Sequence, residues 1–370
     1  MCSSIYIKIA LFLTSIILLF YCSPSSKAPI KIGLMVTLTG KYPELGREIR
    51  DGAFLAIDEI NKNGGIRGRK LQLLIKDNRG DREVAKSNYL EFINEDVIAV
   101  IGPATSSTAR AILPLIDTHR LLTISPTVSA TEFSFRDDYF ISLEPNNRQY
   151  GESLGKYVRE KLKPKRIIII ADEINPVYTM DFAGSFIKNL DKNTFIKTIS
   201  FREGITDFDF LIRNALKHEP DLILLVTDAF NSAIITQKIK NLNPQVKIAI
   251  SPWGKSHAFI YNTGYISEGV FSVGFYDESY KEEKFLNFKD KFIKTFGYSP
   301  ESYAINGYNA VMLIKEAILK DADRNTIREK ILNASFNGLL GEIKINKYGD
   351  TETKPFVVIV RNGIFEKLER

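Results

Sequence analysis

Hydrophobic and polar positions along most of this chain alternate between two patterns, so that short apolar runs are followed by amphipathic stretches. Residues 31–37 (KIGLMVT) are typical of a buried strand, and residues 47–62 carry apolar side chains at helical spacing. The alternation continues with strands predicted at 71–77, 97–102 and 121–125 and helices predicted at 84–94 and 106–117. This order favours a parallel sheet covered by helices.

A second set of the same kind begins at Tyr150. Its predicted strands are 166–171 (RIIIIA), 194–201, 221–227 (DLILLVT) and 246–251, and its predicted helices are 151–161, 179–190, 208–218 and 231–242. Two such sets predict an α/β protein with two Rossmann-like lobes, each built on a parallel central sheet. The segment from Trp253 onward adds helices at 281–296 and 307–320 and strands at 341–346, 356–361 and 364–368, and we expect the two lobes to share it.

The N-terminal segment has the pattern of a targeting sequence. Residues 9–21 (IALFLTSIILLFY) follow Lys8 and are too short for a typical membrane span, but they fit the apolar region of a secretory signal. Leu19-Phe20-Tyr21-Cys22 resembles a bacterial lipobox, although a small residue usually stands where Tyr21 does. We therefore predict a signal peptide at 1–21, a linker at 22–29 with a lipid on Cys22, and a membrane-anchored protein in the periplasm or on the cell surface. An ordinary signal peptide and an uncleaved anchor are the alternatives.

Composition excludes several classes of protein. The 370-residue chain is 44% hydrophobic and 25% charged, as in globular proteins longer than one domain. Cys2 and Cys22 are its two cysteines, so the folded body has no disulfide scaffold or cysteine-ligated metal. The three histidines include no HExxH pattern, and we expect neither metal nor cofactor. The net charge of +6 is spread among acids, which disfavours nucleic-acid binding.

No set of residues points to catalysis. The chain lacks a GxSxG motif, an SxxK motif with its partners and a nucleophilic cysteine in its body. We therefore expect a binding protein with no reaction of its own. An enzyme built on the doubly wound sheet is the alternative that the fold class leaves open.

Two hydroxyl-rich loops follow neighbouring strands of the first predicted sheet. Residues 102–108 (GPATSST) open a helix, whose unpaired N–H groups suit an anion, although serine and threonine there also serve as simple caps. Residues 125–131 (SPTVSAT) follow the next strand. Because the carboxyl ends of parallel strands meet at one edge of a sheet, the two loops together predict a polar crevice.

Three residues of the second set follow strands in the same way. Tyr178 lies after the 166–171 strand, either closing over a ligand or as a surface aromatic. Asp228 lies after the 221–227 strand, where it meets a ligand ammonium or caps the next helix. Trp253, the single tryptophan, lines the cleft or packs at the hinge.

An ordered set of motifs carries a resemblance to a known family. The motifs are IKIGLMVTLTG at 30–40, G-x5-GAFLAIDEIN at 46–61, LQLLIKDNRGD at 71–81, VIAVIGPATSST at 97–108 and LLTISPTVSATE at 121–132. This set resembles the leucine/isoleucine/valine-binding protein family, the substrate-binding components of branched-chain amino-acid ABC importers. The resemblance covers nearly all of residues 30–370 and implies the periplasmic binding protein type I fold.

The resemblance implies two lobes joined by three crossovers, expected near 148, 253 and 332, that close on a ligand by hinge motion. Lobe 1 would comprise 30–147 and 254–331, and lobe 2 would comprise 148–253 and 332–370. The ligand-binding positions implied are Ser106 and Ser107 for a carboxylate, the Val128 carbonyl for an ammonium, the Ser129 hydroxyl, Tyr178 as a closing aromatic and Leu45 over the ligand.

One departure from the family affects the expected ligand. The family commonly has an acid after the serine-proline of the second lobe, and here Trp253 stands there. A buried ammonium without a counter-charge is costly, so either Asp228 supplies the charge or the ligand has no ammonium. The resemblance implies a receptor that delivers an amino acid or small carboxylate to an ABC permease. A ligand-sensing receptor or surface protein without a transport role is the alternative.

Overall fold

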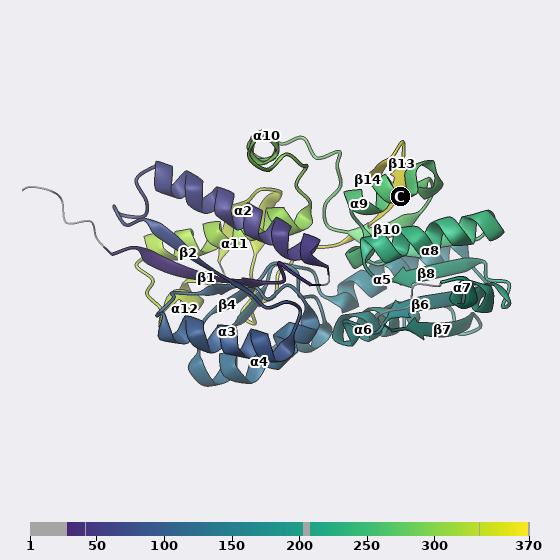
Figure 1. Ribbon diagram of the computed structural model, residues 1–370, viewed down its shortest axis with the longest axis horizontal. Helices are drawn as coiled ribbons and strands as arrows, with labels where there is room; N and C mark the ends of the chain where they lie inside the picture. The colour runs from purple at the N-terminus through teal and green to yellow at the C-terminus, as the bar shows by residue number, and fades with distance from the viewer. Residues whose placement is uncertain (1–27, 41, 203–207, 333, 369–370) are drawn as a thin grey trace, which may run out of the picture.

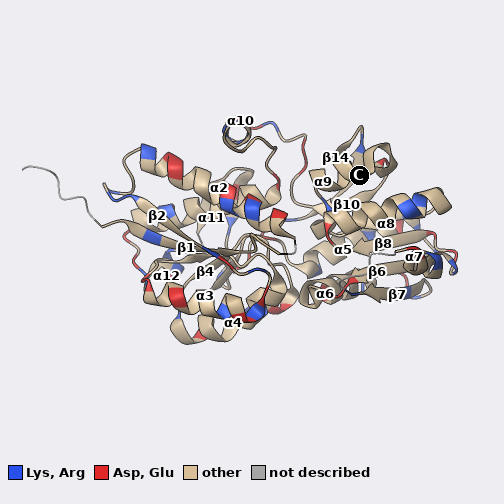
Figure 2. Ribbon diagram, viewed as in Figure 1, with Lys and Arg blue, Asp and Glu red and all other residues tan. Residues whose placement is uncertain are grey.

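The computed structural model describes residues 28–40, 42–202, 208–332 and 334–368. Two α/β lobes lie side by side, each with a central sheet that is covered by helices on both faces (Figure 1). The predicted fold class of two lobes with largely parallel sheets is confirmed. Lys and Arg positions are interspersed with Asp and Glu positions along the ribbons of both lobes (Figure 2). Cys22 and the predicted signal peptide lie outside the described residues.

The first lobe holds a five-stranded parallel sheet with the strand order β2-β1-β3-β4-β5. Its strands are β1 Ile30–Val36, β2 Leu71–Asp77, β3 Val100–Ile101, β4 Thr123–Ser125 and β5 Phe140–Ser142. β5 was not predicted, because three residues are too few to show an alternating pattern. Its pairing with β4 places the chain that follows it at the same sheet edge as the two hydroxyl-rich loops.

Six helices within the described residues cover this sheet. They are α2 Pro43–Lys62, α3 Arg82–Asn94, α4 Ser106–His119, α10 Glu283–Phe296, α11 Ser302–Leu319 and α12 Ile327–Ile331. α2 and α11 cross at close range: a Cβ on Gly52 would lie 2.0 Å from the Ala304 carbonyl oxygen, and one on Gly307 would lie 2.4 Å from that of Ile49. Glycine at both positions lets the two backbones meet.

The second lobe holds a seven-stranded sheet with the order β14-β13-β10-β9-β8-β6-β7. Its strands are β6 Arg166–Asp172, β7 Phe195–Phe201, β8 Leu222–Val226, β9 Lys247–Ile250, β10 Phe271–Gly274, β13 Phe356–Arg361 and β14 Ile364–Lys367. Its helices are α5 Asn147–Tyr157, α6 Pro176–Ile187, α7 Asp209–Leu216, α8 Ala229–Leu242 and α9 His257–Thr263. β13 runs antiparallel to both of its neighbours, and the predicted Asn362-Gly363 turn joins it to β14.

The chain passes between the lobes three times, at residues 143–146, 275–282 and 345–355. The second and third crossovers differ from those expected near 253 and 332. β10 pairs with β9 and β13, so residues 254–274 complete the second sheet instead of joining lobe 1. The hairpin of β11 Ser335–Gly338 and β12 Gly341–Lys344 packs on the first core through Phe336 and Leu339. Strands of four residues give too weak a pattern to assign to a sheet.

Loops at the carboxyl ends of the parallel strands of both sheets face the space between the lobes. Gly102 ends β3 with a φ of +109°, and a Cβ there would lie 2.0 Å from the Met35 carbonyl oxygen. Glycine alone fits this position, which turns the chain toward α4. No helix among the described residues is both long and apolar enough to cross a membrane.

Candidate ligand-binding cleft

A small cavity between the lobes, here named the inner cavity, has a volume of ≈ 30 Å³. Its lining residues are Leu45, Ala104, Thr105, Ser106, Thr127, Ser129, Glu144, Asn175, Tyr178, Pro252, Trp253 and Tyr303. This volume is enough for about two water molecules, because one needs roughly 10–15 Å³ by this measure. The lobes are therefore closed in this structure, and a larger solute enters only when they separate.

Five of the predicted ligand-binding residues meet in the inner cavity. They are Leu45, Ser106, Ser129, Tyr178 and Trp253. Four of them lie in the loops or first helical turns that follow four different parallel strands, and Leu45 lies in the first turn of α2, so the parallel topology brings them together. The tryptophan thus lines the cleft, one of the two positions considered for it.

Two neighbouring residues at the start of α4 line the inner cavity, and one of them also caps the helix. Thr105 is the N-cap, and its hydroxyl accepts a hydrogen bond from the Thr108 N–H at 3.4 Å. Ser106 follows it and is buried, and no side-chain hydrogen bond among the described residues uses its Oγ. A hydroxyl at a helix N-terminus that has no hydrogen-bond partner can donate a hydrogen bond to an anion in the cavity.

Ser107 and Val128 do not line the inner cavity. The Val128 carbonyl oxygen accepts a hydrogen bond of 2.6 Å from the Ser142 hydroxyl, so it faces β5 and not the expected ammonium site. The Ser107 N–H donates to Asn175 Oδ1 at 3.1 Å. Its hydroxyl is buried and has no hydrogen-bond partner among the described residues.

Aromatic side chains form the second-lobe wall of the cavity. Tyr178 stacks on Phe182 with 13° between the ring planes, and its hydroxyl accepts a 3.3 Å hydrogen bond from the Trp253 backbone N–H. The Trp253 ring meets Tyr178 and Tyr42 edge to face, at centroid distances of 5.9 and 5.1 Å. These ring contacts hold Trp253 in place between the inner cavity and the solvent-exposed part of the cleft.

Hydrogen bonds across the cleft hold the lobes together. The Thr131 N–H and hydroxyl donate to Asp181 Oδ2 at 2.7 and 3.0 Å. The Tyr303 hydroxyl donates to the Pro252 carbonyl at 3.2 Å. These contacts join the two lobes at several points around the inner cavity.

Asp228 takes the capping role that was one of its two predicted alternatives. Its Oδ1 accepts hydrogen bonds from the N–H groups of Phe230 and Asn231, at 2.8 and 3.2 Å. Its Oδ2 accepts from Asn231 Nδ2 at 2.6 Å and from the Thr227 hydroxyl at 3.1 Å. Burial raises the pKa of this carboxyl. Asp228 does not line the inner cavity, so it is poorly placed to meet an ammonium there.

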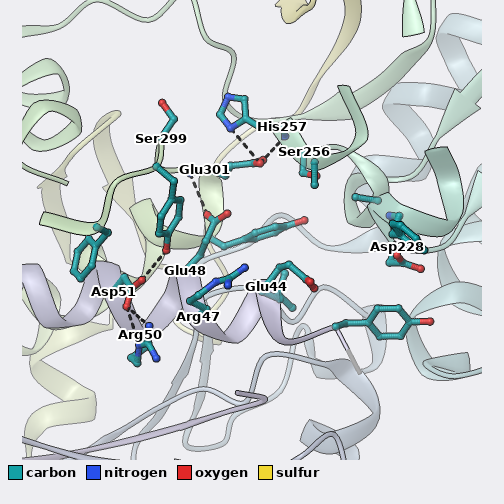
Figure 3. A pocket seen from close by; sticks show the side chains of 18 of the residues that line it. Glu44, Arg47, Glu48, Arg50, Asp51, Asp228, Ser256, His257, Ser299 and Glu301 are labelled. Carbon is teal, nitrogen blue, oxygen red and sulfur yellow. Dashed lines mark hydrogen bonds and ion pairs between the residues drawn. The ribbon is translucent and has the colours of Figure 1, made fainter. Parts of the chain in front are cut away.

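A larger groove of ≈ 810 Å³ lies beyond Leu45, Trp253 and Tyr303 and is here named the outer groove (Figure 3). Figure 3 shows Glu301 between Glu48 and His257. The His257 ring lies 3.2 Å from a carboxylate oxygen of Glu301 and 3.2 Å from one of Glu278. Burial lowers the pKa of His257, but hydrogen bonds and ion pairs with the two glutamates outweigh burial and raise that pKa to about 10. Burial also raises the pKa of Glu48.

Sequence reasoning missed Glu144, which lines the inner cavity from the first crossover. Its carboxylate accepts hydrogen bonds from the Tyr150 hydroxyl at 2.5 Å and from Asn306 Nδ2 at 3.3 Å. Burial raises the pKa of Glu144 to about 8. In the sequence it is a lone acid in an irregular stretch, LEPNN, and carries no motif. Asn175 and Tyr303 also line the cavity, and neither belongs to a motif in the sequence. No group of described residues has the ligands to hold a metal ion.

Comparisons with known proteins agree with this architecture. A Leu/Ile/Val-binding protein of Rhizobium johnstonii is 24% identical over 342 residues, 90% of this chain and 92% of that protein. A branched-chain amino acid transporter substrate-binding protein of Streptococcus pneumoniae, solved with isoleucine, superposes with a TM-score of 0.84 at 22% identity over 91% of this chain and 98% of that one. An ABC transporter solute-binding protein of R. palustris, solved with benzoate, gives 0.81 at 18% identity over 92% and 95%.

The solved structures support the fold, and a family model supports membership. The model for periplasmic binding proteins matches residues 29–362, which include every strand and helix described above except β14. The family expected from the sequence motifs is thereby confirmed. This chain belongs to the periplasmic binding protein family.

Proposed function

We propose that this chain captures an amino acid or a related small carboxylate in the inner cavity and delivers it to an ABC permease. Family membership implies a solute-binding role and a location outside the cytoplasm. The observation that carries the ligand class is Ser106, which lines the cavity at the N-terminus of α4 and whose hydroxyl makes no side-chain hydrogen bond among the described residues. A helix N-terminus with a free hydroxyl favours an anion, and a carboxylate is the anion of suitable size.

The ligands of the two structural neighbours support the same class. Isoleucine and benzoate, bound in those proteins, share a carboxylate on an apolar body. In this chain Leu45, Tyr178 and Trp253 provide apolar surface beside the polar first turn of α4. Such a site distinguishes ligands by their apolar part and holds them by their carboxylate.

Closure of the two lobes is the proposed binding motion. The interlobe hydrogen bonds from Thr131 to Asp181 and from Ser107 to Asn175 exist only when the lobes meet. A ligand larger than two water molecules needs the lobes further apart than in this structure. By bridging both lobes, such a ligand shifts the population from the open form toward a ligand-bound closed form. The permease would then recognise the closed form.

A ligand screen by thermal melting tests the binding function. The four buried hydrophobic clusters of the described residues lie between Ile30 and Phe365, so the chain can be expressed from residue 23. The screen uses amino acids and aliphatic or aromatic carboxylates. A ligand at 100 times its Kd should add about 2.7 kcal/mol to the free energy of unfolding. Absence of any shift across both classes would contradict the proposal.

The membrane anchor is a separate part of the proposal. Cys22 follows the apolar segment directly, and we propose that it carries the lipid. Cells expressing the full chain should incorporate labelled palmitate into it and retain it in the membrane fraction. The C22S variant should lose the label. Equal labelling of both chains would remove Cys22 from this role, with C2S as the matched control.

Uptake measurements test the transport role. Cells that lack this chain should import the ligand found in the screen more slowly, and the S106A variant should not restore uptake. Unchanged uptake, together with ligand binding by the purified protein, would favour the ligand-sensing alternative.

A further inference from the structure

Glu144 is the one side chain with a formal charge among the described residues that line the inner cavity. It is 7% exposed and lies in the first crossover, directly after β5. Buried acids in proteins are usually paired with a cation or serve a function. The partners of this carboxylate therefore decide what it can do.

The neighbours of Glu144 are neutral. Its two hydrogen-bond donors are the Tyr150 hydroxyl at 2.5 Å and Asn306 Nδ2 at 3.3 Å. Tyr178 and Tyr303 also line the cavity beside it. No ion pair among the described residues uses this carboxylate.

Lys255 is the cation among the described residues whose charge acts on Glu144, and it lies against two aromatic rings. The positive charge of Lys255 lowers the pKa of Glu144, which burial raises. The Lys255 Nζ itself lies over the rings of Tyr276 and Phe365, at 5.7 and 5.3 Å from their centroids. Lys255 also does not line the inner cavity. A cation that enters the cavity would therefore find an acid already desolvated and held in position.

The two groups expected to bind an ammonium are not available to do so. Asp228 caps α8 through Oδ1, and its Oδ2 accepts hydrogen bonds from the side chains of Asn231 and Thr227. The Val128 carbonyl accepts from the Ser142 hydroxyl, and neither residue lines the inner cavity. Trp253 lines the cavity but carries no charge. Within the cavity, the anion-binding end at Ser106 and the acid Glu144 both belong to the first lobe or the crossover that leaves it.

We infer that Glu144 binds the ammonium of the ligand and that the inner cavity therefore selects an α-amino acid over the corresponding acid without an amine. This inference rests on the proposed function, since it assigns the second charged group of the same ligand. The carboxylate of the ligand would lie at Ser106 and its ammonium at Glu144. Both charged groups would be held before Tyr178 and Trp253 of the second lobe close over the apolar part.

Paired ligands test the inference by isothermal titration calorimetry at pH 7.5. L-Leucine is compared with 4-methylpentanoate, and L-phenylalanine with 3-phenylpropanoate, so that each pair differs only in the amine. For at least one pair, the unaltered chain should bind the amino acid at least about tenfold more tightly. In E144Q this preference should fall to about twofold or less, while binding of the amine-free acid changes little.

Three further variants make the outcome specific. E144D keeps the charge on a shorter side chain and should keep a preference for the amino acid. E152Q makes the same substitution at an exposed site on α5 and should match the unaltered chain. D228N examines the rival acid, and a greater loss of amino-acid preference in D228N than in E144Q would overturn the inference. Circular dichroism verifies that each variant is folded.

The remaining outcomes separate this inference from the function on which it rests. If the unaltered chain binds the amine-free acids as tightly as the amino acids, the inference falls and the proposed carboxylate binding stands. Retention of the full preference in folded E144Q would also overturn it. If neither class binds, the proposed ligand class fails, and the inference fails with it.

Discussion

The backbone N–H of Ser107 donates a 3.1 Å hydrogen bond to Asn175 Oδ1, and this bond joins the first turn of α4 in one lobe to the start of α6 in the other. It uses an N–H group that a helix N-terminus otherwise offers to an anion. The second lobe thus completes the polar site when the cleft closes. Ser106, one residue earlier, is left facing the cavity.

Replacing Asn175 by alanine should shift the protein toward the open form. A hydrogen bond of this kind contributes about 1 kcal/mol, so the ratio of closed to open molecules should fall about fivefold. Small-angle scattering, or energy transfer between dyes on the two lobes, measures this ratio without ligand. N193A, in an exposed loop of the second lobe, is the control. An unchanged ratio in N175A would show that other contacts determine closure.

Replacing Ser106 by alanine should weaken ligand binding by roughly 1–3 kcal/mol, because the buried carboxylate of the ligand then loses a hydrogen-bond donor. Calorimetry with the ligand found in the screen measures the loss. S335A, at an exposed position of β11 in the same lobe, should bind normally. Equal affinity in S106A and the unaltered chain would place the carboxylate elsewhere, and S107A then becomes the next variant to measure.

Amino-acid binding should release a proton near neutral pH. The pKa of Glu144 is raised to about 8 by burial, so below pH 8 the carboxyl is mostly protonated in the free protein. A bound ammonium requires the ionised form, and affinity should therefore rise by up to about tenfold per pH unit from pH 6 to 8. The nearby ionisable groups are Tyr150, Tyr178, Tyr303 and Lys255.

Calorimetry in buffers of different ionisation enthalpy counts the released proton directly. In E144Q the proton release and the pH dependence of affinity should both disappear. A pH dependence that persists in E144Q would assign the titration to another group.

His257 should make stability depend on pH through its contacts with Glu278 and Glu301. Its folded pKa of about 10 lies above the unfolded value, so the charged imidazole stabilises the fold fully below pH 6.5. This stabilisation declines as pH rises and is lost above about 10. Thermal melts from pH 6 to 10.5 should show the difference between the unaltered chain and H257Q shrinking as pH rises. The charge of His257 also lowers the pKa of Glu48, which burial raises, so the same melts in an E48Q background separate the two groups.

Replacing Gly52 by alanine should destabilise the first lobe. The new Cβ would lie 2.0 Å from the Ala304 carbonyl oxygen, which forces α2 and α11 apart. We expect a loss of roughly 1–3 kcal/mol in the free energy of unfolding. G184A is the matched control, because Gly184 lies inside α6 with no atom within 4 Å of its would-be Cβ. That variant should be neutral or up to about 1 kcal/mol more stable.

Much of the cleft could be predicted from the order of strands and helices. Tyr178, Trp253 and the loops 102–108 and 125–131 were selected because each follows a predicted strand, and the family resemblance singled out Ser106 and Ser129 within those loops. All four residues line the inner cavity. The reason is topological: parallel strands place their carboxyl ends, and the loops after them, at one edge. The arrangement of these loops follows from the hydrophobic pattern of whole strands and helices, and this pattern can be read from the sequence.

Other features depended on contacts between distant segments. Whether Asp228 caps a helix or meets a ligand is decided by the direction of one side chain, and the Val128 carbonyl is directed by Ser142, fourteen residues away. β10 and β5 are too short to show a period, so their pairing, and with it the second crossover, was invisible in the sequence.

The sequence by itself determined the two α/β lobes, the family and the hydroxyl-rich first turn of α4, because periodicity and motif order are local properties of the chain. Only the tertiary structure decided that Glu144 shares a cavity with Ser106. Nothing local marks an acid in an irregular stretch as buried. Its burial comes from Tyr150, Asn306 and the second lobe, which approach it only when the chain is folded and the cleft is closed.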